Sequence, residues 1–240
     1  MKALVLAAGY ATRLYPLTLD RSKMLLEVGG RPMVDWVLDA LRTVDGLEEI
    51  YVVTNAKFAP DFRAWAPDGV TVLDDGTTSE EDRLGAIGDI VFGLEAMGLD
   101  DDLIVIAGDN LFTAEIGDFA RLGRERRVPV LAVHDVGDPE AMSRYNTTEV
   151  DGEGRITYFE EKPQRASSTL AGIALYFYPR ETLPLIRRYV AEGNNRDQPG
   201  RLVQWLYPHV PFYVWRLPGD WYDIGSPDTL AAASEVFATK

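Results

Sequence analysis

Apolar residues in the first 144 positions of the chain follow two alternating patterns. Continuous apolar runs, typical of strands buried on both faces of a sheet, occupy positions 2–8, 48–55, 70–73, 103–107 and 128–134. Between them, apolar residues recur three and four positions apart, as on one face of a helix: Val34, Val37, Leu38 and Leu41 after Pro32, then Leu84, Ile87, Val91 and Leu94, then Ile116, Phe119 and Ala120. This alternation predicts an α/β fold with a mostly parallel sheet and helices on both faces.

The pattern changes after about residue 144. Residues 145–163 predict two strands around a Gly-containing turn, followed by a strand at 169–179, a helix near 181–192, a strand at 210–217 and a last helix from Pro227. Ser226 is placed to cap this helix, with Pro227 at its first position. The chain carries no repeat, low-complexity tract or linker. We therefore expect a single domain over 1–240, in which 145–240 contributes a small, β-containing lobe.

Composition and charge exclude several classes of function. The chain has 240 residues, 46% of them apolar, and a net charge of −14, which argues against nucleic acid as a partner because its phosphates require dense Lys/Arg surfaces. No stretch approaches the ~20 apolar residues of a membrane span. The run after Lys2 is too short for a signal peptide, and Arg13 follows it closely. We expect a cytoplasmic protein without a membrane partner, and the absence of Cys leaves no thiol chemistry.

The loop "LAAGYATRLYPLT", residues 6–18, follows the first predicted strand directly and is typical of a phosphate-binding turn. Neither common phosphate motif is present, because "GYATRL" lacks the glycines of G-x-G-x-x-G and no G-x-x-x-x-G-K-[ST] occurs. Gly9 is the only glycine of the loop, and Ala11 stands where a second is expected. An alanine fits there if its φ is negative, or if the loop opens slightly.

Three polar clusters follow predicted strands: Gly9–Arg13, "GDN" at 108–110 and "YDIG" at 222–225. In open α/β sheets, ligands bind at the carboxyl ends of the strands. Lys23 and Lys162 stand out because only five of the 24 basic residues are lysines, and a lysine supplies a compact point charge. Each residue also has a structural explanation when taken singly, since Asp109 could form a turn and Lys162 could be a solvated strand end.

The motifs taken together are more specific. In chain order they are "LAAGYATRLYPLT", "SKMLLEVGGRPM", "AGDN", "FEEKP", "AGIALYFY" and "WYDIGSPDTL", which extend from residue 6 to residue 230. This series resembles the sugar nucleotidyltransferases, or sugar-1-phosphate pyrophosphorylases, of which glucose-1-phosphate thymidylyltransferase is a well-known member. The resemblance implies a Rossmann-like three-layer α/β/α nucleotidyltransferase fold. On this resemblance we expect the short form, without the β-helix domain of longer members.

The resemblance also implies an activity and two substrates. The family joins a nucleoside triphosphate and a sugar-1-phosphate into an NDP-sugar and pyrophosphate, by in-line attack on the α-phosphate. Residues 1–144 would then mainly bind the nucleotide, and 145–240 mainly the sugar phosphate. The implied nucleotide-binding residues are Leu6, Ala8, Gly9, Ala11, Thr12, Arg13, Lys23 and Gly85, of which Arg13 and Lys23, together with Asp109, are the implied catalytic residues.

The remaining implied roles concern the acceptor and a metal ion. Asp109 and Asp223 match the carboxylates that hold Mg²⁺, which takes few protein ligands and completes its shell with phosphate oxygens. Lys162 matches a lysine on the sugar phosphate and Glu161 a contact to sugar hydroxyls. Asn146 and Gly172 lie in segments that pass close to the sugar. A homo-oligomer is compatible with the family.

Several departures leave the base and the sugar open. The usual Pro-Lys-Pro reads "SKM" at 22–24, the usual "YGV" reads "YNT" at 145–147, and the base-reading region reads "TTSEEDRLGAIGD". One alternative is a cytidylyltransferase acting on phosphocholine or another non-sugar phosphate, in which Tyr145 and Trp221 would stack on a quaternary ammonium. A second alternative is a non-catalytic nucleotide-binding module on the same fold.

Overall fold

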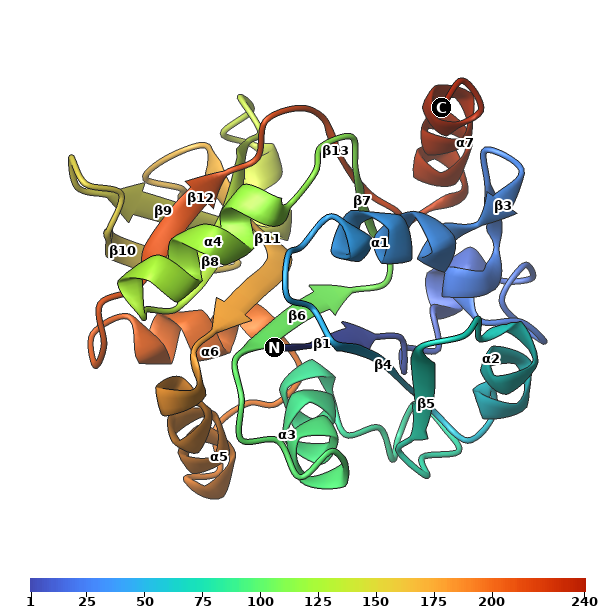
Figure 1. Cartoon of the computed structure of the whole chain (residues 1–240). Helices are drawn as coiled ribbons and strands as arrows, with labels where there is room; N and C mark the ends of the chain where they lie inside the picture. The colour runs from blue at the N-terminus through green and yellow to red at the C-terminus, as the bar shows by residue number, and fades with distance from the viewer.

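The computed structural model describes all of residues 1–240, which form a seven-stranded sheet between two layers of helices (Figure 1). The strand order is β12-β8-β11-β6-β1-β4-β5. The bounds are β1 Lys2–Leu6, β4 Glu49–Thr54, β5 Val70–Asp74, β6 Leu103–Ala107, β8 Val130–Asp135, β11 Leu170–Tyr178 and β12 Tyr213–Arg216. All neighbouring pairs are parallel except those of β11, which runs antiparallel to β6 and β8. The predicted α/β/α architecture with a mostly parallel sheet is confirmed.

Helices cover both faces because the central strands are apolar on both sides. Along β1, Ala3 and Val5 belong to one buried cluster with α1, α2, α4 and α7, whereas Leu4 and Leu6 belong to another with α3, α5 and α6. Side chains alternate between the faces of a strand, so a continuous apolar run supplies two cores. The bounds are α1 Met33–Arg42, α2 Ala59–Trp65, α3 Ala86–Ala96, α4 Gly117–Arg126, α5 Leu183–Ala191, α6 Pro199–Leu206 and α7 Pro227–Phe237.

Element boundaries follow the local signals at most places. Ser226 caps α7 by accepting a hydrogen bond from the Thr229 amide, and Pro227 occupies the first helical position, as predicted. Pro32, however, precedes α1 as its N-cap rather than opening it. The seven-residue α2 and eight-residue α6 were not predicted, because elements this short carry little periodic signal.

Three two-stranded ribbons lie outside the main sheet. They pair β2 (Glu27–Val28) with β3 (Arg31–Pro32), β7 (Asn110–Phe112) with β13 (Trp221–Asp223), and β9 (Asn146–Val150) with β10 (Ile156–Glu161). The β9–β10 ribbon confirms the predicted pair of strands around a turn. The "YDIG" segment was expected to follow a strand of the sheet, but Asp223 instead ends β13, directly opposite Asn110 of β7.

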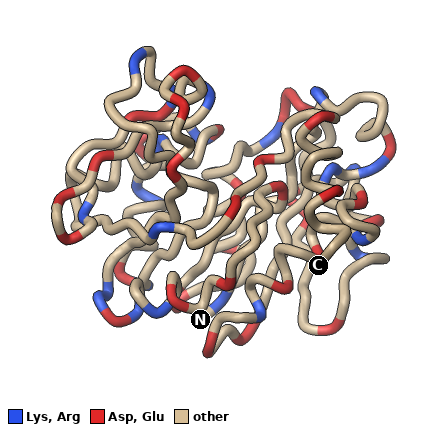
Figure 2. Tube along the Cα trace, turned by 90° about the horizontal axis from the view of Figure 1, so that it is seen from above, with Lys and Arg blue, Asp and Glu red and all other residues tan.

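Charged residues occur in all parts of this framework (Figure 2). Figure 2 shows acidic positions around the whole outline, with basic positions interspersed among them. The acidic positions behind the net charge of −14 are therefore spread along the trace rather than gathered in one part of it. No helix is both long and apolar enough to cross a bilayer.

Candidate active site

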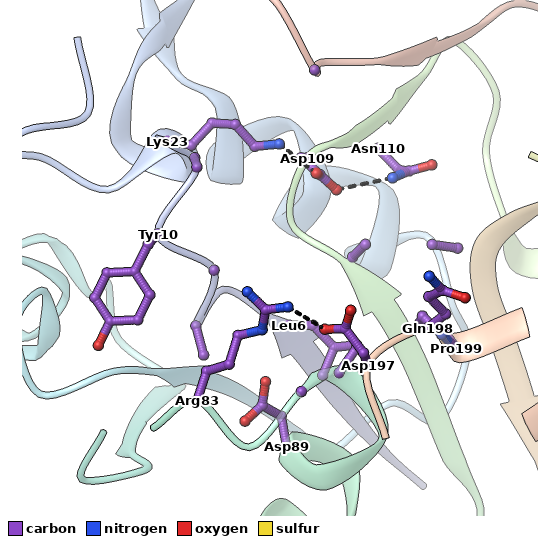
Figure 3. Close-up of a pocket in the computed structure, with 18 of the residues that line it drawn as sticks. Leu6, Tyr10, Lys23, Arg83, Asp89, Asp109, Asn110, Asp197, Gln198 and Pro199 are labelled. Atoms are coloured by element: carbon purple, nitrogen blue, oxygen red, sulfur yellow. Dashed lines mark hydrogen bonds and ion pairs between the residues drawn. The ribbon is translucent and has the colours of Figure 1, made fainter. Parts of the chain in front are cut away.

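A cavity of about 540 Å³ opens beside the loop that follows β1. The parallel strands β1 and β6 end here, and the predicted clusters after them meet at its wall. Most of the predicted site residues line the cavity, namely Leu6, Ala8, Gly9, Ala11, Thr12, Arg13, Lys23, Gly85, Asp109, Glu161, Lys162 and Asp223. Residues far apart in the sequence thus share one hollow. Figure 3 shows Lys23 and Asp109 on one side of it and Arg83, Asp89 and Asp197 on another.

The loop after β1 is fixed from several sides. The side-chain amide of Asn55, after β4, donates to the carbonyl of Ala8 at 2.8 Å, and the hydroxyl of Thr18 donates to the carbonyl of Ala11 at 2.9 Å. A short 3₁₀ turn over Thr12–Leu14 follows, which leaves the side chain of Arg13 exposed at the cavity rim. The loop is therefore a preformed turn whose arginine is accessible to an anionic ligand.

Ala11 adopts the left-handed conformation, with φ 49° and ψ 44°. Of the two ways in which an alanine could fit here, the negative φ is therefore ruled out. A non-glycine residue in this region costs roughly 1–2 kcal/mol. The amide of Leu14 and the hydroxyl of Thr18 both bond to the Ala11 carbonyl and hold the residue in this geometry. The loop thus has at Ala11 the backbone conformation that usually requires a glycine.

Lys23 forms the polar centre of the cavity wall. Its Nζ donates to Oδ2 of Asp109 at 2.5 Å and to the carbonyl of Ile224 at 2.8 Å, and the residue is only 9% exposed. Burial opposes ionisation of Asp109, yet the Lys23 ammonium and a hydrogen bond from Asn110 hold the pKa of Asp109 below its usual range. A buried cation and a partly buried carboxylate are therefore paired at the carboxyl end of β6.

Asp223 adds a second carboxyl group next to this pair. Burial, with the negative charge of Asp109 as the next cause, raises the pKa of Asp223 to about 6. The negative charge of Asp109 disfavours ionisation of Asp223, and a divalent cation between the two carboxylates would relieve this repulsion; Mg²⁺ is held by one or two carboxylates plus substrate oxygens. No cluster of three or more metal-ligating side chains exists in the chain. The residues fit an ion whose remaining ligands come from phosphate and water.

Glu161 and Lys162 reach the cavity from the end of β10. The amide of Lys162, at a positive φ of 52°, donates to the carbonyl of Tyr145 at 2.8 Å. Glu161 packs against Gly200 at the start of α6 so closely that a Cβ on Gly200 would overlap its Oε2 atom. Burial raises the pKa of Glu161 to about 7, against the opposing charges of Lys162 and Arg201. This end of the cavity offers a cation beside a carboxyl group of high proton affinity.

Asn146 and Gly172 do not line the cavity. The Asn146 side chain donates to the carbonyl of Gly172 at 2.9 Å and accepts from the Gly172 amide at 2.6 Å. Both polar atoms of the amide group are therefore occupied in joining β9 to β11. The structure gives these two residues a framework role in this conformation. The rings of Tyr145 and Trp221 form an edge-to-face pair with their centroids 5.2 Å apart. These two residues also lie outside the cavity lining.

The end of the cavity near α3 holds charged residues that the sequence did not single out. Gly85, with φ 79°, precedes α3 and lies against the carbonyl of Arg196, so a side chain would clash there. Arg83 forms ion pairs with Glu80 and Asp197, which connects the segment before α3 to the segment before α6. Asp89 lies within the same lining and is buried. In the sequence, Asp89 was marked only by its position as an acid between the apolar Ile87 and Ile90.

The sequence of this chain is similar to those of known proteins. The sequence profile of the family described as nucleotidyl transferase matches residues 2–240. A glucose-1-phosphate thymidylyltransferase of Streptomyces antibioticus is 34% identical over 94% of this chain and 63% of its own length. A UTP–glucose-1-phosphate uridylyltransferase of Synechocystis is 27% identical over 95% of this chain and 61% of its own length. The chain thus spans about three fifths of the length of these two relatives.

The fold agrees with solved structures. A putative glucose-1-phosphate thymidylyltransferase from Bacillus anthracis, solved in complex with sucrose, superposes with a TM-score of 0.85. The match covers 100% of this chain and 96% of that chain, at 24% sequence identity. The three-layer architecture is therefore shared over the whole chain.

Proposed function

The chain belongs to the nucleotidyl transferase family, and from this premise we propose that it transfers a nucleotidyl group from a nucleoside triphosphate to a sugar-1-phosphate. The observation that carries the proposal is the meeting of Lys23, Asp109 and Asp223 between the loop after β1 and the Glu161–Lys162 segment. Two phosphate-bearing substrates require positive charge on either side of the reacting phosphorus. Arg13 and Lys23 supply it on one side and Lys162 on the other.

The reaction is a substitution at phosphorus without an enzyme nucleophile. A phosphate oxygen of the sugar-1-phosphate attacks the α-phosphorus, a new P–O bond forms, and the bond to the β-phosphate oxygen breaks. The electron pair of that bond leaves with pyrophosphate. The side chains contribute alignment and neutralisation of the charge that develops on the α-phosphate and the leaving group. Lys23, fixed by Asp109 and Ile224, is placed for this task.

Asp109 and Asp223 would hold a Mg²⁺ ion, which when bound neutralises phosphate charge and orients the oxygens. The ionised state of Asp109, maintained by Lys23, keeps one ligand ready. Asp223 has a pKa of about 6 and is mostly ionised at neutral pH. Leu6, Ala8, Gly9, Ala11 and Thr12 form the wall against which the nucleotide would lie.

Lys162 and Glu161 are proposed to bind the acceptor. The Lys162 ammonium suits a phosphate, and the Glu161 carboxyl suits sugar hydroxyls. Phosphocholine is a weaker candidate, because Tyr145 and Trp221 lie outside the cavity lining and the indole Nε1 of Trp221 already donates to Asn110. Asn146 and Gly172 would support the acceptor site through the β9–β11 link rather than by contact.

A matrix assay tests the proposal. UTP, dTTP, CTP, GTP and ATP are each combined with a panel of sugar-1-phosphates and with phosphocholine, with Mg²⁺ or with EDTA, and pyrophosphate release is measured. We expect turnover with at least one sugar-1-phosphate in Mg²⁺ only. Turnover with phosphocholine alone would mean that the acceptor is phosphocholine and not a sugar-1-phosphate. Nucleotide binding without turnover for any pair would indicate a non-catalytic module.

A further inference from the structure

The end of the cavity near α3 contains a buried acid that the phosphate, metal and sugar roles leave unused. Asp89 lies in the first turn of α3, is 6% exposed and lines the cavity. Its Oδ1 atom is buried and has no hydrogen-bond partner. A buried polar atom without a partner costs on the order of 1–3 kcal/mol. An acid at this position of an apolar helix therefore requires a chemical explanation.

Asp75, which follows β5, lies within hydrogen-bonding reach of Asp89. Its Oδ1 accepts from the amide and the hydroxyl of Thr77, each at 2.7 Å, whereas its Oδ2 is buried without a partner. Two carboxyl groups in such contact share one proton. The proton is assigned to Asp89, because Asp89 is the more deeply buried of the two acids. Burial, reinforced by the charge of Asp75, raises the pKa of Asp89 to about 8.

The neighbouring charges do not neutralise this pair. Arg83, the cation on this part of the lining, is already engaged with Glu80 and Asp197. Tyr10, from the loop after β1, also lines the cavity and carries a buried hydroxyl without a partner. A proton on Asp89 would give these two buried, partnerless oxygens, Oδ1 of Asp89 and Oδ2 of Asp75, a hydrogen bond. The second oxygen of Asp89, Oδ2, remains available to the cavity as a hydrogen-bond acceptor.

The position of Asp89 relative to the phosphate site identifies what it faces. Lys23 and Asp109 lie on one side of the cavity, and Asp89 lies across it, near Leu6 (Figure 3). If the α-phosphate lies beside Lys23, the ribose and base extend along Leu6, Ala8 and Gly85 toward the start of α3. The edge of the base is then the part of the nucleotide that comes nearest to Asp89.

Resting on the proposed function, we propose that Asp89 selects the nucleobase by accepting a ring N–H through its free oxygen. The centre of the Watson–Crick edge is an N–H donor in uracil, thymine and guanine, and a bare nitrogen acceptor in adenine and cytosine. An acceptor oxygen pairs with the first group and repels the second. A site built to bond a donor discriminates strongly against an analogue that lacks it, because its own polar group is then left unpaired. The enzyme should therefore use UTP, dTTP or GTP in preference to ATP and CTP.

The experiment measures KM and kcat for the five triphosphates with the best sugar-1-phosphate. The proteins are the wild type, Asp89→Asn, Asp89→Leu and Asp102→Asn. Asp102 is a matched control, since it is also buried (8% exposed) but binds Arg127 and the amide of Arg180 outside the cavity. In Asp89→Asn the amide nitrogen can donate to Asp75 and the oxygen can still accept from the base, so the order of bases and KM should persist within about threefold. Asp89→Leu should raise KM for the triphosphate of the preferred base about tenfold or more and erase most of the preference among the bases. The KM values and the base preference of Asp102→Asn should equal those of the wild type.

A second readout needs no variant. Wild-type enzyme should use N3-methyl-UTP, or N1-methyl-GTP if GTP is preferred, at least about tenfold less efficiently than the parent nucleotide. The selection of the base by Asp89 is overturned by a preference for ATP or CTP, by equal use of the methylated nucleotide, or by unchanged base ratios in folded Asp89→Leu. In each of these cases turnover persists, so nucleotidyl transfer itself stands. If no pair turns over and calorimetry shows no triphosphate binding, both proposals fail.

Discussion

The Nζ atom of Lys23 lies 2.5 Å from Oδ2 of Asp109, and these two residues are 86 positions apart in the sequence. The contact joins the segment after the phosphate loop to the end of β6, and the same Nζ reaches the carbonyl of Ile224 at 2.8 Å. One ammonium group therefore ties three distant segments together at the proposed reaction centre. This arrangement makes the two cavity lysines unequal, because Lys162 has no such anchoring.

Lys23 and Lys162 should have different kinetic effects. Lys162→Met should raise KM for the sugar-1-phosphate far more than KM for the nucleotide, because Lys162 is proposed to bind the acceptor phosphate. Lys23→Met should mainly lower kcat, since charge builds on the α-phosphate and pyrophosphate in the transition state. Losing such a charged contact costs on the order of 2–4 kcal/mol, or about 30- to 1,000-fold. Kinetics with each substrate varied in turn distinguish the two.

Lys2 provides the control for both variants. It pairs with Glu49 at the opposite end of β1, so Lys2→Met removes a paired lysine without touching the cavity. Its kinetic constants should stay near those of the wild type. Equal effects of the two cavity lysines on both substrates would mean that the acceptor pocket is misplaced.

Removal of either proposed metal ligand should abolish most activity. Asp109→Asn and Asp223→Asn should each lower pyrophosphate release by about two decades or more, and excess EDTA should do the same to the wild type. Asp135→Asn is the matched control, because Asp135 ends β8 at the same edge of the sheet but does not line the cavity. Full activity of the wild type in EDTA would rule out the metal site.

Ala11→Gly should be nearly neutral or slightly stabilising. Glycine removes the strain of φ 49°, which costs the folded state roughly 1–2 kcal/mol. It also gives the unfolded chain more conformational entropy, which lowers stability by about 0.4–1 kcal/mol. Turnover should remain within a few-fold, since the backbone shape is unchanged. Urea unfolding measures the free energy of unfolding, with Ala40→Gly inside α1 as a control that should lose about 0.5–1 kcal/mol. A comparable loss in Ala11→Gly would contradict the left-handed geometry.

Asp89→Asn should change how stability depends on pH. The pKa of Asp89 in the folded protein, about 8, lies above its ordinary value of 3.8. The unfolded chain therefore releases this proton first, and the folded state loses stability as pH rises from about 4 to 8. The asparagine variant lacks this loss, so its advantage over the wild type should grow with pH and reach on the order of 2 kcal/mol or more at pH 8. Unfolding by denaturant at pH 5, 6.5 and 8 tests the trend, and a difference independent of pH would refute it.

Gly200→Ala should disturb the acceptor site through Glu161. The added Cβ would overlap Oε2 of Glu161, so either the carboxyl group or the start of α6 must shift. Overpacking of this kind costs about 1–3 kcal/mol, and KM for the sugar-1-phosphate should rise more than KM for the nucleotide. Gly152→Ala is the control, because a Cβ there meets no atom within 4 Å. An unchanged acceptor KM in a folded Gly200→Ala would argue against a role for Glu161.

Much of the fold and of the site could be predicted from the sequence. The spacing of apolar residues along a segment reflects its local secondary structure. The apolar runs that form β1, β4, β6 and β8, alternating with helical patterns, therefore predicted a parallel sheet with helices on both faces. The polar residues after two of those strands had to meet at one edge, because parallel strands share their carboxyl ends. For this reason Gly9, Arg13 and Asp109 could be placed at the cavity before any contact was known.

Only the tertiary structure decided the rest, because it depends on which distant groups are buried together. The sign of φ at Ala11 depends on bonds to its carbonyl from Leu14 and Thr18. Asn146 stands in a sugar-binding motif where the family usually has glycine, and its amide group is occupied by Gly172 of β11. The contact between Asp89 of α3 and Asp75, after β5, brings together two acids from distant segments, and burial raises the proton affinity of Asp89 there. Desolvation and pairing across the fold leave no periodic trace in a sequence, so they appear only once the chain is folded.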